Sequence, residues 1–135
     1  MSEVLSWLPE PDDSNRPYFE GALEGKLRLQ QCSDCNSWMF PVRHRCQACG
    51  GTQLQWEDAS GRGTVYTHAV LHREYHPRHA GQLPLVMAQV DLDEGVRVNT
   101  NLVDVGSGAV KAGMKVVVCF ERSPAGEAIV VFKPA

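Results

Sequence analysis

The sequence predicts a mainly β protein, with a short N-terminal helix, a small metal-bound ribbon and then a five-stranded barrel. Two observations carry this prediction. Four of the five cysteines form two CxxC pairs, Cys32 with Cys35 and Cys46 with Cys49. From Ser60 onward, apolar and polar residues alternate with a period of two, which is typical of half-buried strands. The chain of 135 residues, 43% of them hydrophobic, suits one core with a small appendage.

The N-terminal part predicts an extended lead and one short helix. In PEPDDSNRP, residues 9–17, the prolines fix the backbone angle φ, and Ser14 or Asn15 can cap a helix that is entered near Pro17. The predicted helix covers residues 17–25 and ends at a glycine. Its apolar residues share roughly one face at the helical period: Tyr18, Phe19, Ala22 and Leu23.

The two CxxC pairs have the spacing of a tetrahedral zinc site. Each CxxC turn brings two thiolates to one edge of a tetrahedron, and the ten residues between the pairs can form a hairpin that returns the chain to the same ion. Asn36 and Gly50, which follow the two pairs, readily adopt the positive φ that completes such a turn. We therefore expect the four cysteines to hold a structural zinc ion, which stabilises a segment with little core of its own.

Other uses of the cysteines fit the pattern less well. A redox-active CxxC is a single pair at the start of a helix, whereas here there are two pairs and no helical pattern follows either. A catalytic zinc ion needs an open coordination position, which four protein ligands do not leave. The fifth cysteine, Cys119, alternates with apolar residues in VVVCFER, so we expect a small strand side chain there rather than a nucleophile.

The alternating half of the chain predicts an OB-fold. One longer crossover, residues 104–113, comes after the third β-rich run. A five-stranded Greek-key barrel with an insertion at that place is the layout of an OB-fold, and a five-stranded sandwich is the alternative. The runs are residues 61–72, 84–93, 96–104, 114–123 and 127–134.

Three parts are expected along the chain. They are an N-terminal extension with its helix, a zinc ribbon and an OB-fold, at residues 1–26, 27–58 and 59–135. In an OB-fold, ligands usually bind at the loops that correspond here to residues 72–83 and 123–127. The first loop carries side chains that suit an anion such as phosphate, although solvated loop residues are the simpler account. These side chains are Arg73, His76, Arg78 and His79. His72, His76 and His79 also have the spacing of one helical face, which would suit a metal ion, but Pro77 argues against a helix there.

The stretch FPVRHR, between the two CxxC pairs, combines aromatic and basic side chains. If Trp38 and Phe40 are exposed beside Arg43 and Arg45, this stretch suits a protein interface, where aromatic residues and arginine are enriched. If the two aromatic side chains pack onto the barrel instead, the arginines are merely solvated. The sequence favours neither alternative over the other.

The compartment is expected to be the cytoplasm. The N-terminus, MSEVLSWLPEPDD, lacks the basic start and the apolar run of a secretory signal, and VVVCF and AIVVF are too short to span a bilayer. In a reducing compartment, closely spaced cysteines are more often metal ligands than disulfides. No membrane association is therefore expected.

These features together resemble a known family. QCSDC, FPVRHRC and CGG precede WEDASGRGTVYTHAVLH, PLVMAQVDLDEG and GMKVVVCFE. The same order of elements is found in the OB-fold and rubredoxin-like zinc-ribbon proteins grouped under domain of unknown function 35, which are often described as acyl-CoA-associated. The resemblance extends from about Arg16 to Pro134.

The resemblance implies the role of a partner subunit. Such proteins commonly bind thiolase-like enzymes in pathways that build or degrade acyl-CoA thioesters, including those of steroids, fatty acids and isoprenoid precursors. It implies that the four cysteines bind zinc, that the ribbon and helix dock on the thiolase-like subunit, and that the barrel helps to enclose the CoA thioester. Candidate acyl-CoA or partner contacts, chosen on charge and position, are Arg43, Arg45, Arg62, Trp38 and Phe40.

The expected function is thus a non-catalytic subunit of an acyl-CoA enzyme complex. Once zinc takes four thiols, only Cys119 remains, with no base near it in sequence, and no carboxylate pair or serine triad is readable. Nucleic-acid binding is the rival, because zinc ribbons and OB barrels both serve it. The net charge of -3 and the absence of aromatic residues from PLVMAQVDLD and VRVNTNLVD argue against that rival. A small hydratase or aldolase that acts alone is the third hypothesis.

Overall fold

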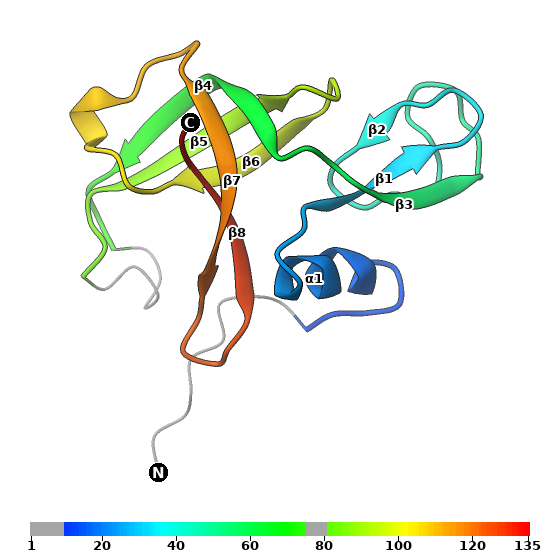
Figure 1. Ribbon diagram of the computed structural model, residues 1–135, viewed down its shortest axis with the longest axis horizontal. Helices are drawn as coiled ribbons and strands as arrows, with labels where there is room; N and C mark the ends of the chain where they lie inside the picture. The colour runs from blue at the N-terminus through cyan, green and yellow to red at the C-terminus, as the bar shows by residue number, and fades with distance from the viewer. Residues whose placement is uncertain (1–9, 75–80) are drawn as a thin grey trace.

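The computed structural model describes residues 10–74 and 81–135, and it has the mainly β architecture expected from the sequence (Figure 1). A three-stranded sheet lies at one end, with the helix beside it, and a closed barrel lies at the other end. The elements are α1 (Arg16–Leu23), β1 (Arg28–Cys32), β2 (Trp38–Met39), β3 (Leu54–Asp58), β4 (Arg62–Leu71), β5 (Leu85–Leu92), β6 (Arg97–Leu102), a 3-10 turn (Ser107–Ala109), β7 (Lys115–Arg122) and β8 (Ala128–Pro134).

The helix α1 begins one residue before the predicted start and ends two residues before the predicted end. Pro17 lies in its first turn, where a missing N–H breaks no helical hydrogen bond. At the other end, Gly25 has a φ of 76°, a left-handed conformation that glycine adopts without strain. The chain can therefore reverse at once into β1.

The barrel has the strand order β4-β5-β6-β8-β7 and closes on itself. Each of its five strands lies within one of the five predicted runs, so the predicted OB-fold layout is confirmed. The neighbouring strands are antiparallel except β6 and β8, which run parallel and share one ladder pair, Leu102 with Phe132. The crossover between β6 and β7 carries the 3-10 turn.

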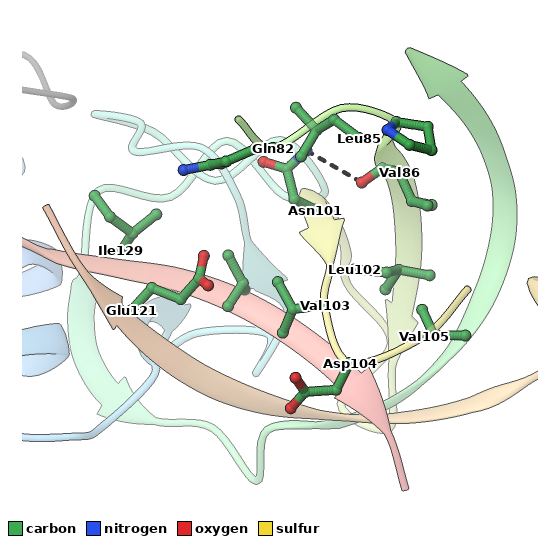
Figure 2. Close-up of a pocket in the computed structure, with 12 residues that line it drawn as sticks. Gln82, Leu85, Val86, Asn101, Leu102, Val103, Asp104, Val105, Glu121 and Ile129 are labelled. Carbon is green, nitrogen blue, oxygen red and sulfur yellow. Dashed lines mark hydrogen bonds between the residues drawn. The ribbon is translucent and has the colours of Figure 1, made fainter. Parts of the chain in front are cut away.

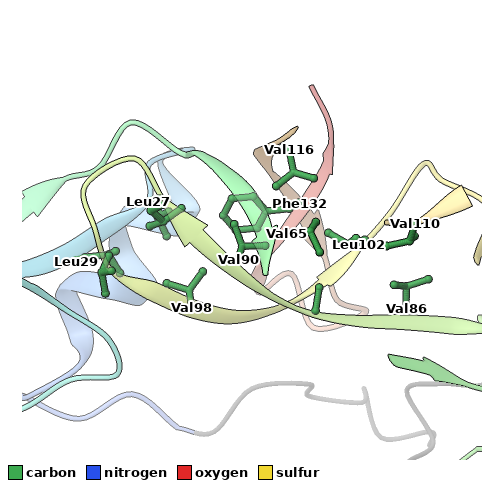
Figure 3. Packing of buried hydrophobic residues seen from close by; sticks show 13 residues of the cluster. Leu27, Leu29, Val65, Val86, Val90, Val98, Leu102, Val110, Val116 and Phe132 are labelled. Carbon is green, nitrogen blue, oxygen red and sulfur yellow. The ribbon is translucent and has the colours of Figure 1, made fainter. Parts of the chain in front are cut away.

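One hydrophobic core joins the barrel to the ribbon. Its centre is formed by Phe132, Val90 and Val65 (Figure 3), and the Phe132 side chain is 0% exposed. Leu27 and Leu29, which lead into and lie within β1, belong to the same buried cluster. Burial of apolar surface is the main favourable term in folding, so this shared core holds the ribbon sheet against the barrel.

Among the described residues, no helix has both the length and the apolar character needed to cross a bilayer.

Candidate metal centre and adjoining surfaces

The fold brings the four cysteines of the two CxxC pairs together at the outer end of the ribbon. All four sulfur atoms lie within 4.8 Å of one another. Two of the distances join one pair to the other, with 3.6 Å from Cys32 Sγ to Cys49 Sγ and 3.5 Å from Cys35 Sγ to Cys46 Sγ. A zinc ion with Zn–S bonds of about 2.3 Å requires tetrahedral edges of about 3.8 Å between sulfur atoms. The four thiols therefore fit one tetrahedral zinc ion.

The two CxxC turns have the same backbone construction. Asn36 has a φ of 63° and Gly50 a φ of 74°, as the sequence predicts. The Asn36 N–H donates to the Cys32 carbonyl at 2.8 Å, and the Gly50 N–H donates to the Cys46 carbonyl at 2.9 Å. Each turn is closed by a hydrogen bond that ends at the residue with positive φ, which aims both sulfur atoms of a pair to one side.

Hydrogen bonding and crowding shift the pKa values of the two exposed thiols in opposite directions. Hydrogen bonding between Cys35 and the side chain and backbone of Ser37 lowers the pKa of Cys35 to about 6. For Cys49, the Gly51 N–H acts to lower the pKa, but the neighbouring Cys35 and Cys32 thiols raise it to about 12. A divalent cation binds all four groups as thiolates and displaces their protons, so metal affinity falls as the pH is lowered.

The ribbon has little apolar core beneath this site. Its own buried cluster consists of Cys32, Met39 and Cys46, with Leu54 packed against it. Two of these three buried residues are candidate metal ligands. A bound ion would thus supply much of what holds the outer ribbon together, which is the role of a closed structural zinc site.

Gln30 positions the loop between the two CxxC pairs. This β1 side chain is only 7% exposed. Its Nε2 donates to the Arg43 carbonyl at 2.9 Å, and its Oε1 accepts from the Arg43 N–H at 2.7 Å. The amide thus satisfies both backbone groups of one loop residue, as a neighbouring strand would. No local sequence pattern marks Gln30, because the backbone groups that it binds are brought close only by the tertiary fold.

Replacing Gln30 with leucine is expected to destabilise the ribbon by about 1–3 kcal/mol, because the Arg43 N–H and carbonyl lose their partners in a partly buried site. Gln31→Leu is the matched control, since the Gln31 side chain makes one exposed hydrogen bond to the Asn36 carbonyl. Zinc-release rates and urea unfolding curves measure the effect. Equal curves for the two variants would contradict the positioning role.

An apolar groove of about 200 Å³ lies between α1 and the ribbon. Asn15, Tyr18 and Gln30 are among the residues that line it, and the Asn15 Oδ1 accepts a hydrogen bond from the Asp12 N–H at 2.8 Å. Within residues 10–74 and 81–135, the Tyr18 hydroxyl has no hydrogen-bond partner. The apolar residues that line the groove are Phe19, Leu29, Met39, Phe40, Pro41, Val42 and Trp56.

The burial of Tyr18 predicts that its hydroxyl loses its proton at an unusually high pH. Burial raises the pKa of the phenol from 10.0 to about 12. Because the folded pKa lies above the unfolded one, the stability linked to this group is complete below pH 10.0 and is lost as the pH rises to about 12. Phenolate absorbance measured during an alkaline titration, with Tyr18→Phe as the reference, should place the Tyr18 transition near the upper value. A transition near 10 would show that the ring is solvated.

The candidate contact residues of the ribbon are divided between two places. A cleft of about 540 Å³ separates the ribbon from the turn between β5 and β6, and Trp38, Phe40 and Arg43 line its ribbon side. Trp38 and Phe40 are half-buried and also pack against the shared core. The two aromatic side chains thus both pack onto the barrel and line an open cleft, which combines the two alternatives that the sequence left open. The Arg45 side chain instead turns back on the second CxxC turn, where Nη1 donates to the Gly50 carbonyl at 3.4 Å.

Two arginines of the barrel have partners of their own. Arg62, on β4, lies 3.6 Å from the Asp93 carboxylate and is not among the residues that line the cleft. Arg97, on β6, does line the cleft. Its guanidinium donates to both Asp91 oxygens, at 2.7 and 3.2 Å, and lies 3.4 Å from the centre of the Tyr66 ring. Only a cross-strand contact reveals this stacked pair, so sequence reasoning did not find it.

The loops expected to bind ligands are described in part. Residues 75–80, with His76, Arg78 and His79, lie outside the described residues. The loop from β7 to β8 is closed by the Ser123 N–H, which donates to the Glu127 carbonyl at 2.9 Å.

This combination of a four-cysteine ribbon and a closed five-stranded barrel defines a class of zinc-ribbon and OB-fold proteins. Family models match both parts, the ChsH2 rubredoxin-like zinc ribbon domain at residues 19–55 and the ChsH2 C-terminal OB-fold domain at residues 56–121. The chain belongs to the ChsH2 family, which includes proteins of the DUF35 group. The family resemblance, the fold class and the structural zinc ion predicted from the sequence are thereby confirmed.

Individual relatives have related descriptions. The chain is 34% identical to a "Probable enoyl-CoA hydratase alpha subunit" of Thermomonospora curvata over 98% of its own length, and 33% identical to a "DUF35 domain-containing scaffold protein" of Methanocaldococcus jannaschii over 68%. It spans 41% and 65% of the lengths of these two relatives.

A solved structure matches nearly the whole chain. It is described as "Ltp2-ChsH2(DUF35) aldolase" and superposes with a TM-score of 0.83 at 32% identity. The match covers 94% of this chain and 98% of the solved chain.

Proposed function

We propose that this protein is a non-catalytic accessory subunit of a thiolase-like or hydratase enzyme complex that acts on acyl-CoA thioesters in lipid or steroid metabolism. The observation that carries the proposal is the match over 98% of a chain from the Ltp2-ChsH2(DUF35) aldolase structure. The hydratase subunit and scaffold descriptions of the relatives from T. curvata and M. jannaschii support the same role. In this role the catalytic groups belong to the partner.

The zinc ion has a structural task in this proposal. Cys32, Cys35, Cys46 and Cys49 are its ligands, and four thiolates leave no open position for substrate. The proposed division into residues 1–26, 27–58 and 59–135 assigns partner docking to the first two parts and ligand enclosure to the barrel. The shared core containing Leu27 and Leu29 supports a fixed geometry between these parts.

The docking face is the groove between α1 and the ribbon. It is lined mainly by aromatic and aliphatic side chains, the composition found at the centre of protein interfaces. The Tyr18 hydroxyl, without an internal partner among the described residues, can donate to a carbonyl or carboxylate of the partner. The helix and the ribbon loop would thus act as a single docking surface.

The contact with the CoA thioester belongs to the cleft between the ribbon and the barrel. Trp38 and Arg43 line it on one side and Arg97 on the other. Arg97 is neutralised by Asp91, whereas the Arg43 guanidinium has no ion pair within the described part of the chain. Arg43 is therefore the better candidate for a CoA phosphate, and Arg45 and Arg62 are weaker ones.

Replacing Val42 with aspartate is expected to reduce partner association at least about tenfold, because a charge without a partner would be buried in the apolar interface. Val42 is half-buried and belongs to neither core cluster, so the fold should be retained. His44→Asp, at an exposed position of the same loop, is the control. Both variants are co-purified with the partner, and equal recovery would place the docking face elsewhere.

The test of the proposed function is native mass spectrometry of the protein co-expressed with its thiolase-like genomic neighbour. A complex of fixed stoichiometry that retains zinc and takes up a CoA thioester supports the proposal. Failure to associate at both low and moderate salt would contradict it. Turnover of an acyl-CoA by the isolated chain would contradict the non-catalytic assignment.

One observation favours nucleic-acid binding as the second candidate. Tyr66 is 52% exposed on the barrel surface with Arg97 stacked against it, and single-stranded nucleic acids bind to such aromatic platforms. Asp91 neutralises this arginine, and the net charge of -3 does not favour a polyanion. Tight, salt-sensitive retention of single-stranded RNA or DNA in a filter-binding titration would reverse the ranking.

A further inference from the structure

A third cavity, of about 350 Å³, lies where the barrel closes between β6 and β8 (Figure 2). The two strands are joined there by one ladder pair, Leu102 with Phe132. Val103, which comes directly after β6, lines the cavity on one side. Ile129 and Val131, which precede Phe132 on β8, line it on the other. We call this cavity the seam pocket.

The seam pocket has an apolar wall and an acidic mouth. Ile129 and Val131 are buried, and Val131 is 2% exposed. Asp104 and Glu121, whose side chains are drawn in Figure 2, also line the pocket and are exposed. Across residues 10–74 and 81–135, neither carboxylate accepts a hydrogen bond or forms an ion pair.

The other polar groups of the seam pocket do not neutralise these charges. The Asn101 side-chain amide donates to the Val86 carbonyl at 3.2 Å, as the dashed line in Figure 2 shows. Burial raises the pKa of the nearby Cys119 thiol, Lys133 opposes this shift, and Asp104 and Glu121 add to it. This end of the barrel therefore carries two negative charges, on Asp104 and Glu121, and one nearby positive charge, on Lys133. Within the described residues, Lys133 forms no ion pair with either carboxylate.

We propose that the seam pocket receives a lysine or arginine side chain from the partner protein, with the aliphatic stem against Ile129 and Val131 and the cation beside Asp104 and Glu121. Long basic side chains bury their methylene groups along apolar surface and keep the charge at a polar rim. Complementary charges at such a rim set the register of an association and increase its rate. The proposal relies on the proposed function only for the existence of a partner.

The same chemistry separates the seam pocket from the proposed CoA site. The phosphates of CoA carry negative charge and are repelled by two carboxylates that form no ion pair within the described residues. The cleft beside Arg43 has the opposite character, so cationic and anionic ligands are directed to different faces. An amine should therefore distinguish the seam pocket from the cleft in the isolated chain.

The pocket is tested first with small probes on the zinc-loaded full chain. In NMR titrations, n-butylammonium and n-butylguanidinium should give saturable shifts confined to residues 101–105, 119–121 and 129–131, and butyrate should give none there. Asp104→Asn combined with Glu121→Gln should weaken amine binding on the order of tenfold. Glu57→Gln combined with Asp93→Asn, which lowers the acidic charge equally outside the pocket, should leave it unchanged.

Three results would overturn the proposal. They are the absence of saturable amine shifts, equal shifts with butyrate, and unchanged binding in the Asn/Gln double variant. A parallel sample carries Arg78→Ala, because this residue precedes the pocket residue Gln82 in sequence and lies outside the described residues. Amine binding that requires this replacement would identify the chain's own arginine as the occupant and would also overturn the proposal.

The complex supplies a second, independent measurement. Co-purification of the partner should be weakened by the Asn/Gln double variant and retained by the Glu57 and Asp93 control. If the partner binds both variants equally, the seam pocket inference fails while the proposed function stands. If no partner binds the unmodified chain, the proposed function fails, and the amine titration still decides the chemistry of the pocket.

Discussion

Cys46→Ser should yield protein that lacks zinc and has lost the ordered outer ribbon. Cys46 is buried, and its sulfur lies 3.5 Å from that of Cys35 within the four-thiol cluster. A structural zinc ion contributes on the order of 10 kcal/mol to folding a small metal-bound unit, and the ribbon's own core cannot replace it. We expect a large decrease in soluble protein, zinc content near zero and loss of partner association.

Cys119→Ser is the control for this experiment. Cys119 lies on β7, away from the four-thiol cluster, and is half-buried. This variant should retain zinc at one ion per chain and unfold close to the unmodified protein. Elemental analysis and thermal unfolding measure both variants. If the Cys46→Ser protein stays folded with one zinc ion per chain, Cys46 is not a ligand of the ion and the four-cysteine site is wrong.

Phe132→Ala should destabilise the barrel by about 3–5 kcal/mol, a large share of the roughly 5–15 kcal/mol that holds an ordinary domain together. Phe132 is 0% exposed, lies at the centre of the shared core and pairs with Leu102 where the barrel closes. The truncation leaves a cavity among residues from several strands, which cannot all move to fill it. Urea unfolding in the presence of excess zinc measures the loss.

Met87→Ala is the control for the core truncation. Met87 is 47% exposed on β5, and replacing it should change the free energy of unfolding by no more than about 0.5 kcal/mol. A loss below about 1 kcal/mol for Phe132→Ala would mean that the core collapses around the smaller side chain.

The parts of the fold set by short-range patterns were predictable from the sequence. Period-two alternation located all five barrel strands, and turn chemistry located the positive φ of Asn36 and Gly50. The ends of α1 were less accurate, because the prediction started the helix at Pro17 and counted Gly25 within it. Local propensity fixes which elements exist better than where they end.

Features that depend on distant contacts were not predictable. Leu27 and Leu29 belong to the barrel's core cluster although they lie in or beside the ribbon strand β1, and no periodicity reports that packing. The hydrogen bonds between Gln30 and Arg43 were also not predictable, because the two residues are thirteen positions apart in sequence. A buried glutamine in a short strand is a signal that an internal hydrogen-bond partner must exist, although the sequence does not say which one.

The candidate contacts show the same limit. Charge and position in the sequence grouped Arg43, Arg45 and Arg62 together, but only Arg43 lines the cleft between ribbon and barrel. The seam pocket combines residues from four strands and two loops, so no local motif marks it.

The core shared by ribbon and barrel has a thermodynamic consequence for recognition. Because Leu27 and Leu29 are buried with the barrel residues, swivelling of the ribbon against the barrel would expose apolar surface, and this cost favours a constant spacing between surfaces on the two lobes before any encounter. A binder that touches both lobes at once loses little additional configurational freedom, so more of its contact energy is retained as affinity. The leucine pair thus favours preorganisation of the surfaces that a binder would contact.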